Sequence, residues 1–226
     1  MNEDLIDRLK RNLPVHPGIL GREDFPNTAV IVPLVFFDGV PFFLFQKRSE
    51  SIRQGGEICF PGGRSDPRKD RDIRETAIRE TSEELGIHRE SMTIIGQLDT
   101  LVAHMGVTVD SFVATLSIKS IDELRINRSE VECVFSLPVS MFRKAPEEYS
   151  VLLSVHPSII DDLGNEKVLF PAKELSLPER YTRPWGHIRH NVYVYRTDKG
   201  VIWGITAAII RAVMLYADTH YAETSR

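Results

Sequence analysis

The octapeptide "RETSEELG", Arg79 to Gly86, places three glutamates within about one and a half turns of a predicted helix. Glu80, Glu83 and Glu84 stand at positions i, i+3 and i+4, so they share an arc of about 100° on one helical face. Carboxylates this close repel each other and cost helix stability. An isolated acidic cluster is usually a solvated surface. A hard divalent cation such as Mg²⁺, which binds carboxylate and phosphate oxygens together, also explains the crowding.

The residues before the cluster favour the cation. The predicted helix, Glu75–Leu85, follows a long loop, Arg48–Arg74, and long loops are usually functional. Within this loop, "FPGG" contains Gly62 and Gly63, which let the backbone approach a ligand closely and leave a carbonyl that can bind a metal. Arg79 stands beside the acidic face and can pair with it. A glycine turn, a basic residue and an acidic helix in series suit Mg²⁺-dependent pyrophosphate chemistry.

Strand-like and helical segments alternate along the rest of the chain. Strands are predicted at Thr28–Phe37, Phe42–Arg48, Met92–Leu101, Val107–Ile118 and Val131–Leu137, further helices at Asp4–Arg11 and Thr206–Ala217, and a hairpin at His190–Gly204. Prolines are spread through residues 140–185, which we expect to be a mixed region. We expect a single domain over residues 1–226, with its core at about 28–215.

The composition is that of an ordinary soluble globular protein, with 42% hydrophobic and 27% charged residues. The net charge of -4 argues against a nucleic-acid partner that needs a basic surface. The first residues lack the apolar core of a signal peptide, and no apolar run approaches ~20 residues, so we expect a cytoplasmic protein without a membrane span. Cys59 and Cys133 lie in apolar stretches and are predicted to be buried free thiols in a reducing compartment.

The stretch from Gly63 to Ile87 resembles the signature of the Nudix hydrolases, G-x5-E-x7-R-E-U-x-E-E-x-G-U, where U is aliphatic. The closing half of the signature is matched from Arg79 onwards, with Thr81 in place of one aliphatic residue. Fifteen residues separate Gly63 from Arg79, against thirteen in the general pattern, and Arg71 stands where a glutamate is expected. Three nearby carboxylates could replace that glutamate: Asp66, Asp70 and Asp72.

The residues from Arg48 to Gly63, "RSESIRQGGEICFPGG", resemble the coenzyme A diphosphatase branch of that family, as does "VIWGITAAII", Val201–Ile210. The resemblance implies an α/β fold, a Nudix-type α/β/α sandwich with a mixed central sheet. It also implies an enzyme that uses Mg²⁺ or Mn²⁺ to hydrolyse coenzyme A or acyl-CoA to 3′,5′-ADP and (acyl-)4′-phosphopantetheine. The alternatives are hydrolysis of another nucleoside diphosphate compound (ADP-ribose, NADH or a dinucleotide) and a catalytically silent nucleotide-binding module.

The same resemblance implies roles for individual residues. The metal ligands are Glu80, Glu83, Glu84 and the carbonyl of Gly63, and Arg79 orients the glutamates. The general base is Glu83 or Glu130, the latter just before the strand-like "VECVFSL". Substrate phosphates are bound by Arg48 and Arg53, whose guanidinium groups match phosphate oxygens, with the Gly62 backbone close to the substrate.

Four further side chains have open roles. His187 and His190 have a spacing that metal ligands can have, but no Cys or third His completes a zinc pattern. Trp185 and Trp203 either stack on adenine or belong to the core.

The expected partner is a small-molecule substrate, with no nucleic acid and no membrane, and the sequence leaves a homodimer open.

Overall fold

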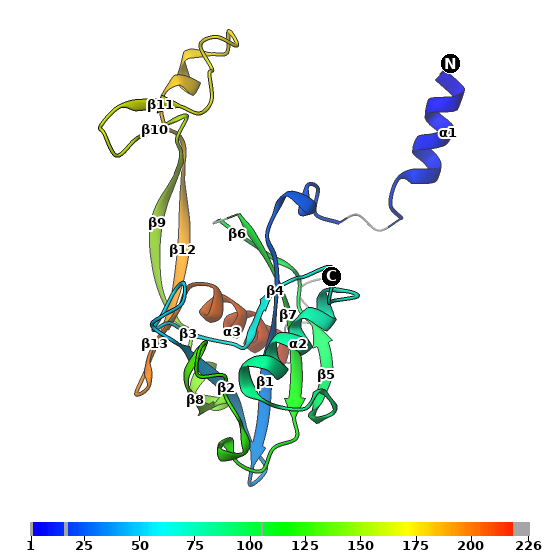
Figure 1. Cartoon of the computed structure of the whole chain (residues 1–226), viewed down its shortest axis with the longest axis vertical. Helices are drawn as coiled ribbons and strands as arrows, with labels where there is room; N and C mark the ends of the chain where they lie inside the picture. The colour runs from blue at the N-terminus through cyan, green and yellow to red at the C-terminus, as the bar shows by residue number, and fades with distance from the viewer. Residues whose placement is uncertain (1, 16–17, 105, 219–226) are drawn as a thin grey trace. The chain divides into compact units, whose positions relative to one another are not determined.

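The computed structural model describes residues 2–15, 18–104 and 106–218 of the chain (Figure 1). Its contacts form two compact units, the first built from Met1–Gln46 and Phe60–Ser136 and the second from Lys47–Cys59 and Leu137–Arg226. The single domain expected over all 226 residues stays a prediction.

The first unit holds most of the regular structure expected from the sequence. Its helices are α1 (Asn2–Asn12) and α2 (Ile73–Leu85), with short 3₁₀ helices at Arg22–Asp24, Arg89–Ser91 and Ile121–Glu123. Its strands are β1 (Asn27–Phe37), β4 (Gly62–Arg64), β5 (Met92–Gln97), β6 (Leu101–Ala103) and β7 (Val107–Leu116), together with β2 (Val40–Arg48) and β8 (Val131–Pro138), which lie mostly within it.

Strand β1 is central to the sheet of the first unit. It runs antiparallel to β2 and β4 and parallel to β7, with Ile31 opposite Phe112. Strands β5 and β6 pair antiparallel with β7, and β8 pairs with β2. Helix α2 packs on β1, β4 and β7. A mixed sheet with a helix packed on it confirms the predicted α/β class.

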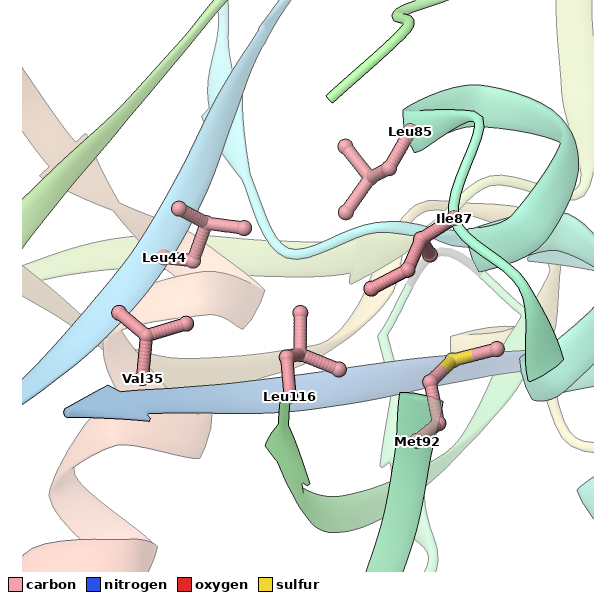
Figure 2. Close-up of a cluster of buried hydrophobic side chains, with 6 residues drawn as sticks. All are labelled: Val35, Leu44, Leu85, Ile87, Met92 and Leu116. Atoms are coloured by element: carbon pink, nitrogen blue, oxygen red, sulfur yellow. The ribbon is translucent and has the colours of Figure 1, made fainter. Parts of the chain in front are cut away.

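The core of the first unit lies between α2 and the sheet. Figure 2 shows one buried cluster, formed by Val35, Leu44, Leu85, Ile87, Met92 and Leu116. Burying each such side chain is worth about 1.5–3 kcal/mol, so this cluster fixes the end of α2 against β1 and β2. Leu85 and Thr81 are buried, so the face of α2 opposite Glu83 points into the core.

The second unit contains a three-stranded sheet in the order β13-β12-β9. Its elements are β3 (Ile58–Cys59), β9 (Glu147–Val155), β10 (Ser158–Ile160), β11 (Glu166–Val168), β12 (Trp185–Thr197), β13 (Gly200–Trp203) and α3 (Gly204–Ala217), with 3₁₀ helices at Val139–Arg143 and Glu179–Thr182. Strands β9 and β12 pair along a long antiparallel ribbon, yellow-green and orange in Figure 1. Helix α3 packs on β12 and β13.

Two expectations from the sequence need correction. The predicted strand Met92–Leu101 is divided into β5 and β6, because Gln97 and Thr100 turn to donate hydrogen bonds to the buried Asp110. The predicted burial of both cysteines is wrong: Cys59 is half-buried, and Cys133 is exposed, as is the neighbouring Glu132 in β8. Both cysteines are free, as predicted.

Candidate active site on helix α2

Local interactions fix where α2 begins and ends. The carboxylate of Asp72 accepts a hydrogen bond from the backbone N–H of Glu75 at 2.9 Å, which caps the first turn. Gly86 ends the helix in the left-handed conformation, with φ at 63°. A Cβ at Gly86 would lie 2.2 Å from the carbonyl oxygen of Arg125, so glycine is required there. Because these contacts fix both ends of α2, they also fix the direction in which its glutamates point.

The two glycines of "FPGG" allow β4 to lie between β1 and α2. A Cβ at Gly62 would lie 2.2 Å from the carbonyl oxygen of Ala29, and one at Gly63 would lie 2.5 Å from the carboxyl carbon of Glu80. The backbone N–H of Gly62 donates to a carboxylate oxygen of Glu84 at 2.8 Å. The glycine turn and the acidic face of the helix are therefore neighbours, as the sequence predicted, and the Gly62 N–H is already used by the helix.

Arg79 donates hydrogen bonds to three carboxylates. Its guanidinium donates to Asp70 at 2.7 and 2.9 Å, to Glu80 at 2.7 Å and to Glu83 at 3.2 Å. Its side chain is only 18% exposed, so these bonds are shielded from water on most sides. Arg79 is placed to orient Glu80 and Glu83.

Asp70 is the buried acidic partner of Arg79. Its side chain is buried and also accepts hydrogen bonds from the Thr76 hydroxyl at 2.8 Å and the Asp66 N–H at 3.0 Å. The Arg79 guanidinium holds the pKa of Asp70 well below its usual range, and Asp70 in turn raises the pKa of Arg79. Arg71, which stands at the signature position, points to solvent and pairs with Glu75 instead.

The two other replacements considered from the sequence have different roles. Asp72 caps α2, and Asp66 accepts hydrogen bonds from the exposed Arg68. Of the three carboxylates, only Asp70 bonds to Arg79 in the described part of the chain. A signal for Asp70 is present in the sequence, since it is the acidic residue immediately before the expected position.

Glu80 lies among like charges. Its side chain is largely shielded from solvent, and burial is the main cause of its raised pKa. The Arg79 guanidinium opposes that shift, while the negative charges of Glu83 and Glu130 add to it. Glu130 therefore contributes to the same electrostatic field as the helix glutamates, although it lies 46 positions after Glu84 along the chain.

Backbone hydrogen bonds explain how Glu130 reaches this region. The N–H of Asn127 donates to the carbonyl of Glu84 at 2.9 Å, and the N–H of Arg125 donates to the carbonyl of Leu85 at 3.0 Å. The segment is thus attached to the last turn of α2. A turn closed by the Glu130 N–H on the Asn127 carbonyl, at 3.0 Å, then leads into β8.

The donor chemistry of these residues fits a hard divalent cation. Glu80, Glu83, Glu84 and Glu130 are oxygen donors, and a cation would relieve the repulsion that Glu83 and Glu130 add to the burial of Glu80. Within residues 2–15, 18–104 and 106–218, however, no three His, Cys, Asp or Glu side chains converge closely enough to hold a metal ion. Arg79 holds two of the carboxylates and the Gly62 N–H holds a third, which explains their separation.

The predicted phosphate-binding arginines belong to the second unit. The Arg48 side chain donates to the backbone carbonyl of Arg53 at 3.2 Å. The Arg48 N–H also donates to the Glu57 carbonyl at 2.9 Å, and the Gly56 N–H donates to the Arg48 carbonyl at 3.0 Å, so the loop closes on itself. The conformation of this loop depends on Gly56, whose φ is 77°.

The aromatic and histidine candidates are also placed within the second unit. Trp203 is 48% exposed, whereas Trp185 is half-buried against Phe170 and Tyr181. His187 lies on the ribbon and exchanges a hydrogen bond with the Ser154 hydroxyl at 3.0 Å. In the part of the chain that the structure describes, no helix is long and apolar enough to cross a membrane.

Comparison with known proteins gives consistent matches. A family model described as the NUDIX domain matches residues 26–154. The chain is 37% identical over 205 residues to Nudix hydrolase 3 of Caenorhabditis elegans, covering 88% of this chain and 77% of that protein. It is 38% identical over 200 residues to the mitochondrial coenzyme A diphosphatase NUDT8 of Homo sapiens, covering 86% and 71%. It is 30% identical over 208 residues to the uncharacterized Nudix hydrolase NudL of Photorhabdus laumondii, covering 92% of each.

Proposed function

Because this chain belongs to the Nudix pyrophosphohydrolase family, we propose that it cleaves the diphosphate of coenzyme A or acyl-CoA, releasing 3′,5′-ADP and (acyl-)4′-phosphopantetheine. The observation that carries a hydrolytic site is the packing of Gly62 and Gly63 against Glu80 and Glu84, with the charge of Glu130 nearby. The choice of substrate rests on the stretch from Arg48 to Gly63 and on the similarity to a coenzyme A diphosphatase.

The residues of the site have separate proposed roles in hydrolysis. We assign metal binding to Glu80, Glu83, Glu84 and the Gly63 carbonyl. When bound, Mg²⁺ or Mn²⁺ would screen the negative charge that the diphosphate brings. Arg79 holds Glu80 and Glu83 in place through its bonds at 2.7 and 3.2 Å. Of these two bonds, the longer one to the half-exposed Glu83 is the weaker and is the one that yields most easily to a cation.

Two carboxylates are candidates for the general base. Glu83 is 53% exposed on α2, and Glu130 stands at the end of a turn before β8. Either one can accept a proton from the attacking water, provided that it is not a ligand of the cation in that step. Arg48 and Arg53 are proposed to contact substrate phosphates, since guanidinium groups bind phosphate oxygens with two parallel hydrogen bonds.

A side-by-side assay tests the substrate. The full chain is incubated with Mg²⁺ and coenzyme A, dephospho-CoA, ADP-ribose, NADH or diadenosine polyphosphates, and the products are identified by mass spectrometry. We expect 3′,5′-ADP and 4′-phosphopantetheine, with kcat/KM about tenfold or more above that for dephospho-CoA, because a lost charge-assisted phosphate contact costs at least about 1.5 kcal/mol. Chelator and Glu83→Gln are the controls. A kcat/KM for ADP-ribose tenfold above that for coenzyme A would overturn the substrate while leaving the carboxylate site as described.

We also propose a cytoplasmic location and leave the oligomeric state to measurement. The names of two relatives place those proteins in mitochondria and in peroxisomes, which are the two alternative locations. Imaging of the tagged full chain in its own cells distinguishes the three. Light scattering of the purified chain at several concentrations distinguishes a monomer from a homodimer.

A further inference from the structure

The second unit contains a pocket that the assignments above do not use. It has a volume of about 730 Å³, within the usual range for sites that bind small molecules. Its walls come from the loop before β3, from β9, and from the β12–β13 hairpin. The side chains on which its chemistry depends are Lys47, Glu57, Tyr149, Arg196, Lys199 and Trp203.

The floor of this pocket is rigid and apolar. Ile58 is 6% exposed, and a Cβ at Gly200 would lie 3.0 Å from the end of its side chain, so the turn of the β12–β13 hairpin sits directly on it. Gly55, in the loop before β3, has its own close contact: a Cβ there would lie 2.7 Å from the Cα of Glu50. The pocket is therefore shaped by backbone contacts that do not need a ligand to form.

Two aromatic rings stand in the walls with much of their surface exposed. Trp203 is 48% exposed and Tyr149 is 50% exposed. On β13 the side chains alternate, so Val201 and Trp203 share the outward face while Ile202 is buried on the other. Large rings exposed beside an apolar floor are suited to stack on a flat aromatic group. Any nucleobase can stack in this way, because each has an aromatic face.

Three cationic side chains accompany the rings. Arg196 donates to Glu147 at 2.9 Å and to the Tyr149 hydroxyl at 3.4 Å, which orients it and uses two of its five N–H donors. Lys199 is half-exposed and lies 4.0 Å from Asp198, at the limit of an ion pair. With Lys47, the lining carries three positive charges against the one carboxylate of Glu57. The lining is thus suited to an anion as well as to a ring.

We propose that this pocket binds a phosphorylated nucleotide, with the base against Trp203 and Tyr149 and a phosphate monoester at Arg196 and Lys199. The choice of adenosine 3′,5′-bisphosphate as its ligand rests on the proposed function, whose product that nucleotide is. Neither Arg48 nor Arg53 lines the pocket, so it is a phosphate-binding site distinct from the one assigned to those arginines.

Tryptophan fluorescence reports this binding directly. In a Trp185→Phe background Trp203 is the only tryptophan, because the chain has two. The full chain, held in chelator so that no metal contributes, is titrated with adenosine 3′,5′-bisphosphate and with adenosine. We expect the bisphosphate to quench Trp203 saturably, and adenosine to bind at least tenfold more weakly.

Charge variants identify where the phosphate binds. Arg196→Gln with Lys199→Gln is expected to weaken binding of the bisphosphate at least tenfold and that of adenosine less than threefold. Lys167→Gln with Lys173→Gln, which removes the same charge from exposed positions of the same unit, should change neither. Calorimetry should show that Trp203→Leu weakens binding of both the bisphosphate and adenosine, because it removes a ring that stacks on the base; equal affinities in wild type and Trp203→Leu would refute the stacking. Circular dichroism checks that each variant is folded. Equal binding by the wild type and the Arg196/Lys199 double variant, or no saturable binding at millimolar nucleotide, refutes the proposal.

The outcomes separate this proposal from the proposed function. Saturable binding that depends on Arg196, without any cleavage of coenzyme A, would support the nucleotide-binding pocket and contradict coenzyme A as the substrate. If the double variant cleaves coenzyme A with unchanged kinetics and the wild type does not bind the nucleotide, the pocket proposal is wrong while the proposed function stands.

Discussion

Replacing Asp70 by asparagine tests whether this residue has taken over the role of the missing signature glutamate. The carboxylate of Asp70 accepts two hydrogen bonds from Arg79, at 2.7 and 2.9 Å, and its side chain is only 2% exposed. An asparagine of nearly the same size keeps one acceptor oxygen but turns a donor NH₂ group toward the guanidinium. The substitution therefore removes one charge-assisted bond and weakens the other without creating a cavity.

The expected loss of stability follows from those contacts. Hydrogen bonds between charged groups are worth about 1.5–3 kcal/mol each, and breaking a buried ion pair costs about 3–5 kcal/mol. Arg79 keeps Glu80 and Glu83 as partners, which reduces the cost. We expect Asp70→Asn to lower the free energy of unfolding by about 2–4 kcal/mol at pH 7. We also expect a weaker apparent affinity for Mg²⁺, by about ten- to a hundredfold, because Arg79 no longer holds the metal-binding carboxylates in place.

The effect on stability depends on pH with a definite sign. Arg79 holds the pKa of Asp70 below its usual value, so the stabilisation is complete above the unfolded pKa of about 3.9 and is lost as the pH falls towards the folded pKa. Asparagine does not titrate. The difference in unfolding free energy between wild type and Asp70→Asn should therefore be constant from pH 7 to about pH 5 and should narrow below about pH 4. Urea denaturation at each pH measures it.

The neighbouring aspartates provide matched controls. Asp66→Asn removes a contact with Arg68, whose side chain is 90% exposed, and should cost less than about 1 kcal/mol. Asp72→Asn keeps a good N-cap residue and should change stability by less than about 0.5 kcal/mol. If Asp70→Asn is no more destabilising than Asp66→Asn, or if its deficit does not change at low pH, the assignment of Asp70 is wrong.

Three further predictions concern the carboxylates and the glycine turn. Glu83→Gln should lower kcat about a hundredfold at saturating Mg²⁺, since it removes a ligand charge or the base, and near-wild-type turnover would contradict both roles. Glu130→Gln should lower kcat much more than it raises KM; an unchanged kcat with reduced stability would make Glu130 structural and leave Glu83 as the base. Gly63→Ala places a Cβ 2.5 Å from the carboxyl carbon of Glu80, so the end of that side chain must move; the substitution should remove most of the activity but cost little stability. Gly18→Ala, which meets nothing within 4 Å, should cost little of either in denaturation and turnover assays.

The parts of the fold that could be predicted from the sequence are those fixed by local chemistry. Gly86 adopts the left-handed conformation and ends α2, so the end of the helix at Leu85 was predicted correctly. The glycines of "FPGG" predicted a close approach of the backbone to another group, and in the structure the group close to Gly63 is the Glu80 carboxylate. The burial of Cys133 was predicted wrongly: it is exposed together with Glu132, although Val131 and Leu137 of the same strand are buried, so apolar neighbours in sequence do not fix the exposure of a single residue.

The role of Asp70 was left open by the sequence for a different reason. A signature fixes positions along the chain, whereas the partner of Arg79 is fixed in space by whatever loop precedes the helix. Here that loop is longer than the general pattern, and its fold is set by the hydrogen bonds of Asp70 to Thr76 and to the N–H of Asp66. A carboxylate one residue earlier than expected can then reach the guanidinium, while Arg71 turns outward. The loop therefore gives Arg79 a buried acidic partner although Arg71 stands at the signature position, and this is why exchanging Asp70, rather than Arg71, is the informative test of the site.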